Sequence, residues 1–340
     1  ELDRYQQQLD TLEGQDRYDR QLLETVLGLA ESSMLLDRFQ ETDLMLDRAV
    51  QIVRVSEGLY TPSQLPFLML SVQNDARRGN WGDARDALEH LLLLYVNNHR
   101  GLDSDLVGEL LQLSDLHLEG VAGDQQEMQS YHLRRADRIN WTAIRVAQRI
   151  WPPNDRRLID LYYRVVRHNY LQATALNQGG ETATKLRETI VGEGWLRPRL
   201  EVELTYYRIG NDMFTRMRQV YALEDPPDLE AIAMTRVYQA DWQVLFNEGR
   251  PRETYLNAYN DLLDAGVEAA DVQNLFRRPQ ILPIREFYPS VSLGLEAMLD
   301  DSPVDSGPSE SDMVVLRFAE WSSALPNVQL PITDPILLQE

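Results

Sequence analysis

Apolar and small side chains recur at helical spacing early in the chain. Two such stripes are Leu23, Val26, Leu27 and Ala30, and then Phe39, Thr42, Leu46 and Ala49. Side chains three or four positions apart share one face of an α-helix, whereas those of a strand alternate at every second position. Alternation of the strand type, followed by a hairpin turn, is not convincing in any segment. The pattern predicts an all-α protein of amphipathic helices.

The two stripes repeat further along the chain. A shift of 42 positions superposes Leu23 on Leu65, Val26 on Leu68, Phe39 on Trp81, Leu46 on Leu88 and Ala49 on Leu91. Each unit is therefore predicted to be a pair of helices with a tight turn at 78–83 and a break between units at 58–62. A third register begins at Val107 and drifts at the glycines of 120–124. Because each hairpin can bury its apolar face only against its neighbours, we expect an α-hairpin solenoid.

Helical spacing continues in the second half of the chain. The predicted helices cover about 125–150, 155–177, 182–192, 198–222, 228–248, 252–265 and 268–277. Proline-bearing breaks at 151–153, 225–227 and 249–251 separate them, because proline cannot continue a helix interior. These helices extend the expected repeat domain over residues 1–298, with the best repeats at 18–96 and degenerate ones after 120.

The turn and second helix of each early unit resemble those of the tetratricopeptide-repeat (TPR) family. Residues 79–84, with Leu88 and Leu91, match the family's Gly-x-aromatic-x-x-Ala pattern, and residues 37–42 match it with Asp37 and Thr42 in place of Gly and Ala. Residues 49–62 are similar to the longer repeat of kinesin light chains. The resemblance implies a right-handed superhelix that binds proteins.

More loosely, the whole chain resembles uncharacterised repeat proteins of Gram-negative bacterial envelopes. That resemblance implies a periplasmic or envelope-associated location. A cytoplasmic location is the alternative.

The composition changes near residue 300. Residues 299–312 contain no basic side chain and are expected to form a flexible acidic linker. Val314, Phe318, Trp321 and Leu325 then form a narrow apolar stripe, which predicts a docking helix within 313–340. This helix would either cap the last hairpin or occupy a groove of its own superhelix or of another chain.

The acidic net charge of the chain disfavours some classes of partner. The chain has 340 residues, 43% hydrophobic and 26% charged, and a formal net charge of −21. An acidic surface repels phosphate backbones and anionic lipids, so no nucleic-acid partner is expected. The chain has no cysteine, which excludes thiolate catalysis and cysteine-based metal sites. The apolar runs are far shorter than the roughly 18 residues of a membrane span.

Motifs that carry chemistry are scarce. The sequence holds no glycine-rich phosphate loop, no Gly-x-Ser-x-Gly elbow and no His-Glu-x-x-His pattern, so we predict no catalytic residues, no metal and no cofactor. An alternative is a helical carbohydrate-active enzyme or glycan-binding protein, suggested by 15 Tyr and 6 Trp with the acidic excess. Its acidic residues would be Glu201 with Glu203, or Asp241 beside Trp242.

One segment reverses the charge of the chain. Nine arginines stand against three acidic residues between Arg134 and Arg167. The predicted partner-binding residues are Arg134, Arg138, Trp141, Arg145, Arg149, Tyr163, Arg164 and Arg167. Arginine forks onto carboxylates and stacks on rings, a composition typical of interface hot spots.

Two interpretations of this segment remain open. Either the arginines pair with the chain's own acidic helices, or they line a groove for an acidic peptide, a carboxylate terminus or an anionic polymer. The second interpretation predicts a non-catalytic scaffold or adaptor that binds a protein or peptide partner.

Overall fold

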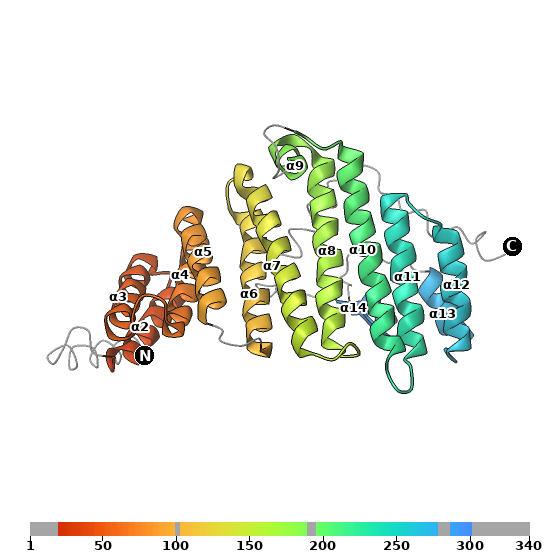
Figure 1. The fold of residues 1–340 in the computed structure, drawn as a ribbon, viewed down its shortest axis with the longest axis horizontal. Helices are drawn as coiled ribbons and strands as arrows, with labels where there is room; N and C mark the ends of the chain where they lie inside the picture. The colour runs from red at the N-terminus through yellow and green to blue at the C-terminus, as the bar shows by residue number, and fades with distance from the viewer. Residues whose placement is uncertain (1–19, 99–102, 189–194, 278–285, 301–340) are drawn as a thin grey trace. The chain divides into compact units, whose positions relative to one another are not determined.

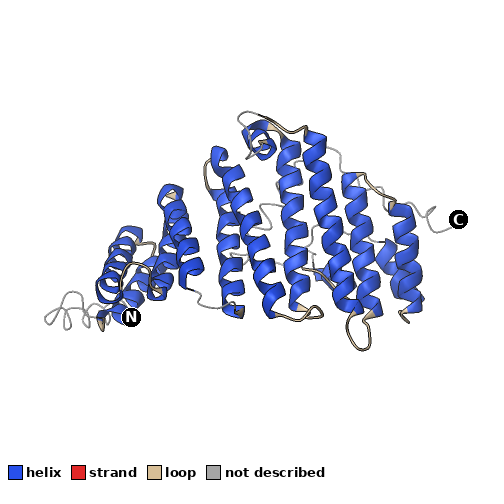
Figure 2. Ribbon diagram, viewed as in Figure 1, coloured by secondary structure: helices blue, strands red, loops and turns tan. Residues whose placement is uncertain are grey.

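The computed structural model describes residues 20–98, 103–188, 195–277 and 286–300, and these are almost entirely helical (Figures 1 and 2). They form no strand; one isolated antiparallel bridge joins Glu188 and Leu196. The prediction of an all-α protein is confirmed. The chain divides into two compact units, one ending at Gln125 and the other beginning at Gln126.

Residues 20–98 and 103–125 of the first unit hold five α-helices and a 3₁₀ turn: α2 (Leu22–Leu35), α3 (Phe39–Glu57), η1 (Pro62–Gln64), α4 (Leu65–Arg77), α5 (Trp81–Asn98) and α6 (Ser104–Gly123). Each helix packs on the next one in the chain. Leu46 and Ala49 are buried, and so are Leu88 and Leu91, their counterparts 42 positions later. Equivalent stripes are thus buried in both hairpins.

The turns inside these hairpins repeat as well. Asp37 and Gly79, again 42 positions apart, both adopt left-handed backbone angles, with φ of 55° and 76°. After each of them, the next N–H donates to the carbonyl five positions back, at 2.9 Å and 2.8 Å. This is the Schellman ending of a helix. Asn247 and Gly266 end helices of the second unit in the same way.

Two helical glycines make room for tryptophan rings. Helix α6 runs through the glycines at which a break was predicted and ends at Gly123. A Cβ on Gly123 would lie closer than 3.0 Å to the ring of Trp81, and one on Gly210 would lie as close to the ring of Trp242. The repeat pattern drifts at 120–124, and there Gly123 permits a close approach between α5 and α6.

The second unit continues the helical succession. It contains η2 (Gln126–Met128), α7 (Gln129–Ile150), α8 (Arg157–Gln178), α9 (Gly180–Arg187), α10 (Arg199–Ala222), α11 (Leu229–Phe246), α12 (Pro251–Asp264), α13 (Ala269–Arg277) and α14 (Val291–Asp300). Helices α7, α8, α10, α11 and α12 pack in that order, and the short α9 packs on both α7 and α8 (Figure 1). The predicted helices are present within a few residues, while α14 was not predicted.

A cluster of aromatic rings closes the core of the second unit. Phe287 lies 4.8 Å from the ring of Tyr238 and 6.0 Å from that of Tyr163, measured between centroids. The backbone N–H of Tyr288 donates to the Tyr238 hydroxyl at 3.2 Å. The chain therefore returns after α13 and fastens onto α8 and α11.

Two predictions fall beyond α14. The docking helix of 313–340 lies outside the described residues, as does the acidic linker of 299–312 after Asp300. Within the described part of the chain, no helix combines the length and the apolarity that crossing a membrane requires.

Candidate functional site

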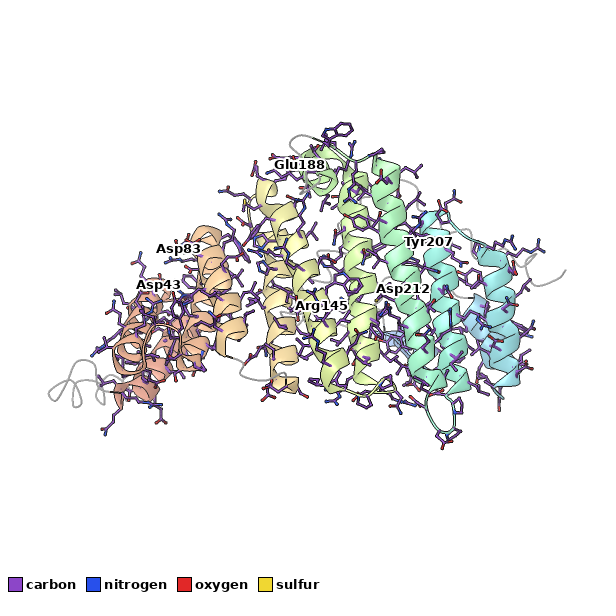
Figure 3. All side chains as sticks on the ribbon, viewed as in Figure 1. Asp43, Asp83, Arg145, Glu188, Tyr207 and Asp212 are labelled. Atoms are coloured by element: carbon purple, nitrogen blue, oxygen red, sulfur yellow. The ribbon has the colours of Figure 1, made fainter. Side chains whose placement is uncertain are left out.

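Helix α7 separates apolar and cationic faces as predicted. Ala136, Ile139, Ala143 and Ala147 are buried on one side. On the other side Arg138, Arg145 and Arg149 are exposed, and Arg134 and Trp141 are half-buried. Figure 3 labels Arg145 on this helix. Local hydrophobic spacing is sufficient to orient α7, because one of its faces packs into the unit while the other meets solvent.

Helix α8 does not present the face that was predicted. Tyr163 is only 3% exposed, and its ring packs against those of Tyr238 and Phe287, so it is not available to a partner at the surface. Arg164 and Arg167 are half-buried. Because α8 packs between α7 and α10, it is covered on two sides, and spacing alone did not reveal the second neighbour.

A pocket of about 450 Å³ lies against the N-terminal half of α7. Its lining comes from η2, α7 and the end of α9: Glu127, Met128, Ser130, Tyr131, Arg134, Arg135, Arg138, Lys185 and Glu188. Four of these side chains are cationic and two are carboxylates. We call this the cationic pocket. It contains two of the predicted binding residues, Arg134 and Arg138, whereas the other predicted residues lie outside its lining.

The far wall of the cationic pocket is built where α9 ends. The Arg134 guanidinium donates to the backbone carbonyl of Glu188 at 3.4 Å. Glu188 pairs with Leu196 in the isolated bridge, so the chain that leaves α9 returns beside the pocket. Trp195 and Leu200, which flank this return, are 78% and 64% exposed. Exposed apolar side chains therefore follow in sequence where the chain comes back to Glu188.

Lys185 lines the pocket from α9, so the residue spacing along α7 could not predict it. Its ammonium lies 2.7 Å from a carboxylate oxygen of Glu181 and donates to the backbone carbonyl of Glu127 at 3.2 Å. On the α7 side, the guanidinium of Arg135 lies 5.8 Å from the centroid of the Tyr131 ring. Lys185 is the only lysine in the sequence, which was the one signal that could have drawn attention to it.

A half-buried acid stands beside the pocket on α7. Burial raises the pKa of Asp137 to about 6, although the neighbouring Arg138 charge lowers it. Burial also raises the pKa of Tyr206, on which Asp137 acts in the same direction and Arg134 in the opposite one. The charge of Arg134 thus acts on the buried Tyr206 hydroxyl. Protonation of Asp137 below about pH 6 makes this end of α7 more positive.

Two arginines of the predicted basic segment pair within the chain. Arg156 donates to both oxygens of Glu224 at 2.8 Å and 2.7 Å, and to Asp228 at 2.9 Å. Arg157 pairs with Asp155 and stacks over Trp151, 4.1 Å from the ring centroid. Internal pairing therefore accounts for these two side chains, which lie at the start of α8.

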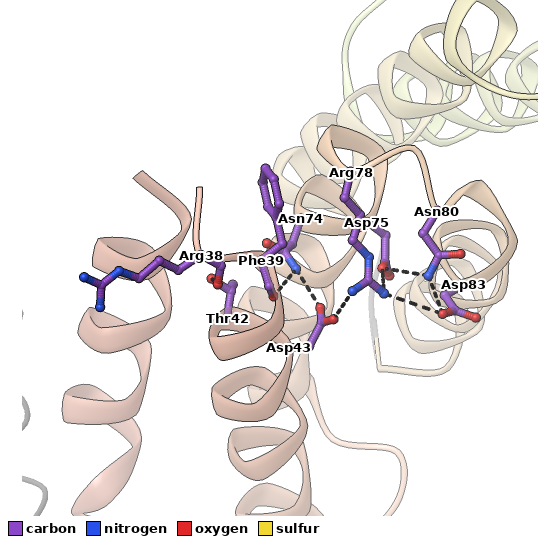
Figure 4. A network of polar contacts seen from close by, with 9 residues as sticks. All are labelled: Arg38, Phe39, Thr42, Asp43, Asn74, Asp75, Arg78, Asn80 and Asp83. Carbon is purple, nitrogen blue, oxygen red and sulfur yellow. Dashed lines mark hydrogen bonds and ion pairs between the residues drawn. The ribbon is translucent and has the colours of Figure 1, made fainter. Parts of the chain in front are cut away.

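The first unit has a polar network of a different kind (Figure 4). Arg78 lies among three carboxylates, those of Asp43, Asp75 and Asp83, and its distance to Asp75 is 2.9 Å. Asn74 donates to Asp43 at 2.6 Å. Burial raises the pKa of Asp75 to about 6, and Arg78 opposes this rise. The network joins α3, α4 and α5 through hydrogen bonds and ion pairs between neighbouring helices, which indicates a structural clamp.

The acidic residues proposed for a carbohydrate-active enzyme do not form a site. Asp241 is 4% exposed and Trp242 is fully buried, so neither can meet a polysaccharide. Glu201 and Glu203 are two positions apart on α10, a spacing that points side chains to different sides of a helix. Within the described ranges, no group of three or more acidic or histidine side chains could hold a metal ion.

Comparison with known proteins finds no relative: no model of a protein family matches the chain, and no curated protein matches it.

Proposed function

We propose that this protein is a non-catalytic scaffold that binds an acidic segment of a partner protein through α7. The observation that carries the proposal is the cationic pocket, with four cationic and two anionic side chains in a protein of net charge −21. The exposed Arg145 and Arg149 extend the same helix face beyond the pocket. A carboxylate-bearing peptide finds here a surface opposite in charge to the rest of the chain.

The chemistry of arginine suits this role. A guanidinium offers a planar fork of donors that matches the two oxygens of a carboxylate, and it keeps its charge at any physiological pH. One exposed ion pair contributes only about 0–1 kcal/mol, so affinity requires several pairs in one concave place. The pocket brings four cationic side chains together in one concave place. The strongly negative remainder of the chain disfavours acidic ligands elsewhere.

We also propose that the helical hairpins form a TPR-like right-handed superhelix. Support comes from the repeated hairpin turn, whose left-handed residues Asp37 and Gly79 are 42 positions apart and make equivalent backbone bonds. Superhelices of this kind offer extended concave surfaces to peptides, which fits a scaffold.

A displayed peptide library tests the proposed function. We expect the purified chain to enrich sequences with several Asp or Glu residues, and Arg138→Glu/Arg145→Glu to lose that enrichment. Arg250→Glu/Arg252→Glu, the same charge change at the start of α12, is the matched control and should retain it. Circular dichroism verifies that each variant keeps its helix content. Enrichment without an acidic excess, or enrichment that survives in the α7 variant, would refute the proposal.

A further inference from the structure

We infer that the cationic pocket is occupied by the chain's own acidic segment, residues 301–312, which competes there with the partner. This inference rests on the proposed function, because it assigns a regulator to the same pocket.

Charge is the first argument for this occupant. Residues 301–312 carry four carboxylates, on Asp301, Asp305, Glu310 and Asp312, and no cation. The pocket presents four cations against two carboxylates. The segment therefore has the composition that the pocket is proposed to select, and it is already part of the chain. An acidic partner must displace it to bind.

Reach is the second argument. The Phe287 ring lies 6.0 Å from that of Tyr163, so the chain before α14 passes near the N-terminal end of α8. The pocket lies near the opposite end of α8, because α7 and α8 are joined by a short turn and run in opposite directions. A helix of 22 residues, like α8, is about 33 Å long. An extended segment of 12 residues spans up to about 40 Å, so a chain that leaves α14 near the N-terminal end of α8 brings the last carboxylates of the segment, on Glu310 and Asp312, to the pocket.

The chain that leads to the acidic segment is held on the second unit. The backbone N–H of Val291, the first residue of α14, donates to the Glu230 carboxylate at 2.8 Å, and the Phe287 ring packs on Tyr238. The acidic segment follows α14 directly and is thus tethered to the unit that holds the pocket.

Tethering makes weak pairs effective. A flexible connection raises the effective concentration of a segment at its site, and the gain falls where the span, here about 33 Å, exceeds the r.m.s. length of the connection, which is about 19 Å for 12 residues. If the effective concentration of the segment equals its dissociation constant, its presence weakens the apparent affinity of an external acidic peptide about twofold. The interaction consists of screened charges, so it weakens as salt is added.

The experiment measures binding of a fluorescein-labelled synthetic peptide with the sequence of residues 300–312, by fluorescence polarisation at low salt. It compares the full wild-type chain with a full chain whose acidic segment is neutralised by Asp301→Asn, Asp305→Asn, Glu310→Gln and Asp312→Asn. We expect the neutralised chain to bind the peptide at least about twofold more tightly. Adding Arg134→Glu/Arg138→Glu should abolish binding, while adding Arg250→Glu/Arg252→Glu should leave it unchanged.

Lys185 locates the bound peptide independently. It is the only lysine, so acylation by an N-hydroxysuccinimide ester, followed by mass spectrometry, reports on one side chain of the pocket and the separate N-terminal amine. In the neutralised chain, we expect the added peptide to slow acylation of Lys185 and not that of the N-terminus. Unchanged acylation of Lys185 at saturating peptide would place the peptide elsewhere and overturn the inference.

The outcomes separate the two proposals. Equal peptide affinity of the wild-type and neutralised chains, abolished in both by the pocket variant, would overturn self-occupancy and leave the proposed function standing. No binding of the peptide to any chain would overturn both.

Discussion

The buried carboxyl group of Asp241 makes the stability of the second unit depend on pH. It lies on α11 with 4% of the residue exposed. One of its oxygens accepts a hydrogen bond from the Tyr255 hydroxyl, while the other is buried and has no hydrogen-bond partner in the described part of the chain. Burial raises the pKa of this carboxyl group from 3.8 to about 7, although the hydrogen bond from Tyr255 opposes the rise.

The sign of the effect follows from proton linkage. Between the unfolded and folded pKa values, the folded state binds more protons than the unfolded state, so stability falls as pH rises. Each pKa unit corresponds to about 1.4 kcal/mol, and a rise of roughly three units gives about 4 kcal/mol between pH 4 and pH 8. Asp241→Asn removes this dependence, because an amide does not titrate in that range.

Urea unfolding of the wild-type chain and Asp241→Asn at several pH values measures this difference. Both chains carry Trp81→Phe, so that every remaining tryptophan belongs to the second unit. We expect the free energy of unfolding of Asp241→Asn, relative to wild type, to increase by about 4 kcal/mol from pH 4 to pH 8. An amide hydrogen without a partner adds a constant cost of about 1–3 kcal/mol, which leaves the slope unchanged.

A substitution at the surface controls for the loss of an acidic residue. Asp264→Asn changes an exposed carboxylate at the end of α12 in the same unit. If the difference between Asp241→Asn and wild type stays the same at every pH, the carboxyl group of Asp241 is not desolvated in the folded protein and the reasoning fails.

The remaining predictions concern glycine positions. Gly210→Ala places a methyl group against the ring of Trp242, and we expect a loss of about 1–3 kcal/mol in urea unfolding, since overpacking exceeds the gain in helix propensity. Gly108→Ala is the matched control, because nothing lies within 4 Å of its Cβ, and it should gain up to about 1 kcal/mol; similar effects of the two substitutions would contradict the close packing. Asp37→Gly should stabilise the first unit by about 1 kcal/mol and Gly79→Ala should destabilise it by a similar amount, because both positions are left-handed. Thermal unfolding followed by circular dichroism checks this pair, and a loss of stability in Asp37→Gly would mean that the aspartate side chain is needed at the turn.

The sequence predicts the hairpins well because their signals are local. Spacing within each helix identified the buried stripes that contain Leu46 in α3 and Leu88 in α5, and the shift of 42 positions placed equivalent turns at Asp37 and Gly79. In α2 the buried stripe includes Leu22 and Leu29, while the predicted Leu23 and Leu27 are half-buried. That helix is apolar on more than one side, so spacing leaves its orientation uncertain by one residue.

The candidate site was predicted only in part, because tertiary packing completes it. Arg134 and Arg138 lie on a helix with one solvent face, and spacing along α7 identified both. Lys185 comes from α9, and no local pattern states that the end of α9 packs beside the start of α7. Tyr163 was misplaced for the related reason that α8 has neighbours on two sides. Helix α14 was missed because Gly294 interrupts a short and weak pattern.

The return of the chain at Phe287 has a consequence for synthesis on the ribosome. Most contacts of the first unit join helices that are consecutive in the chain, so this unit can complete its core soon after it emerges. In the second unit, by contrast, the ring of Tyr163 packs against Phe287, which is synthesised much later. Until that residue is translated, α8 and α11 expose an apolar surface, and this interval is when the nascent second unit most needs protection from aggregation.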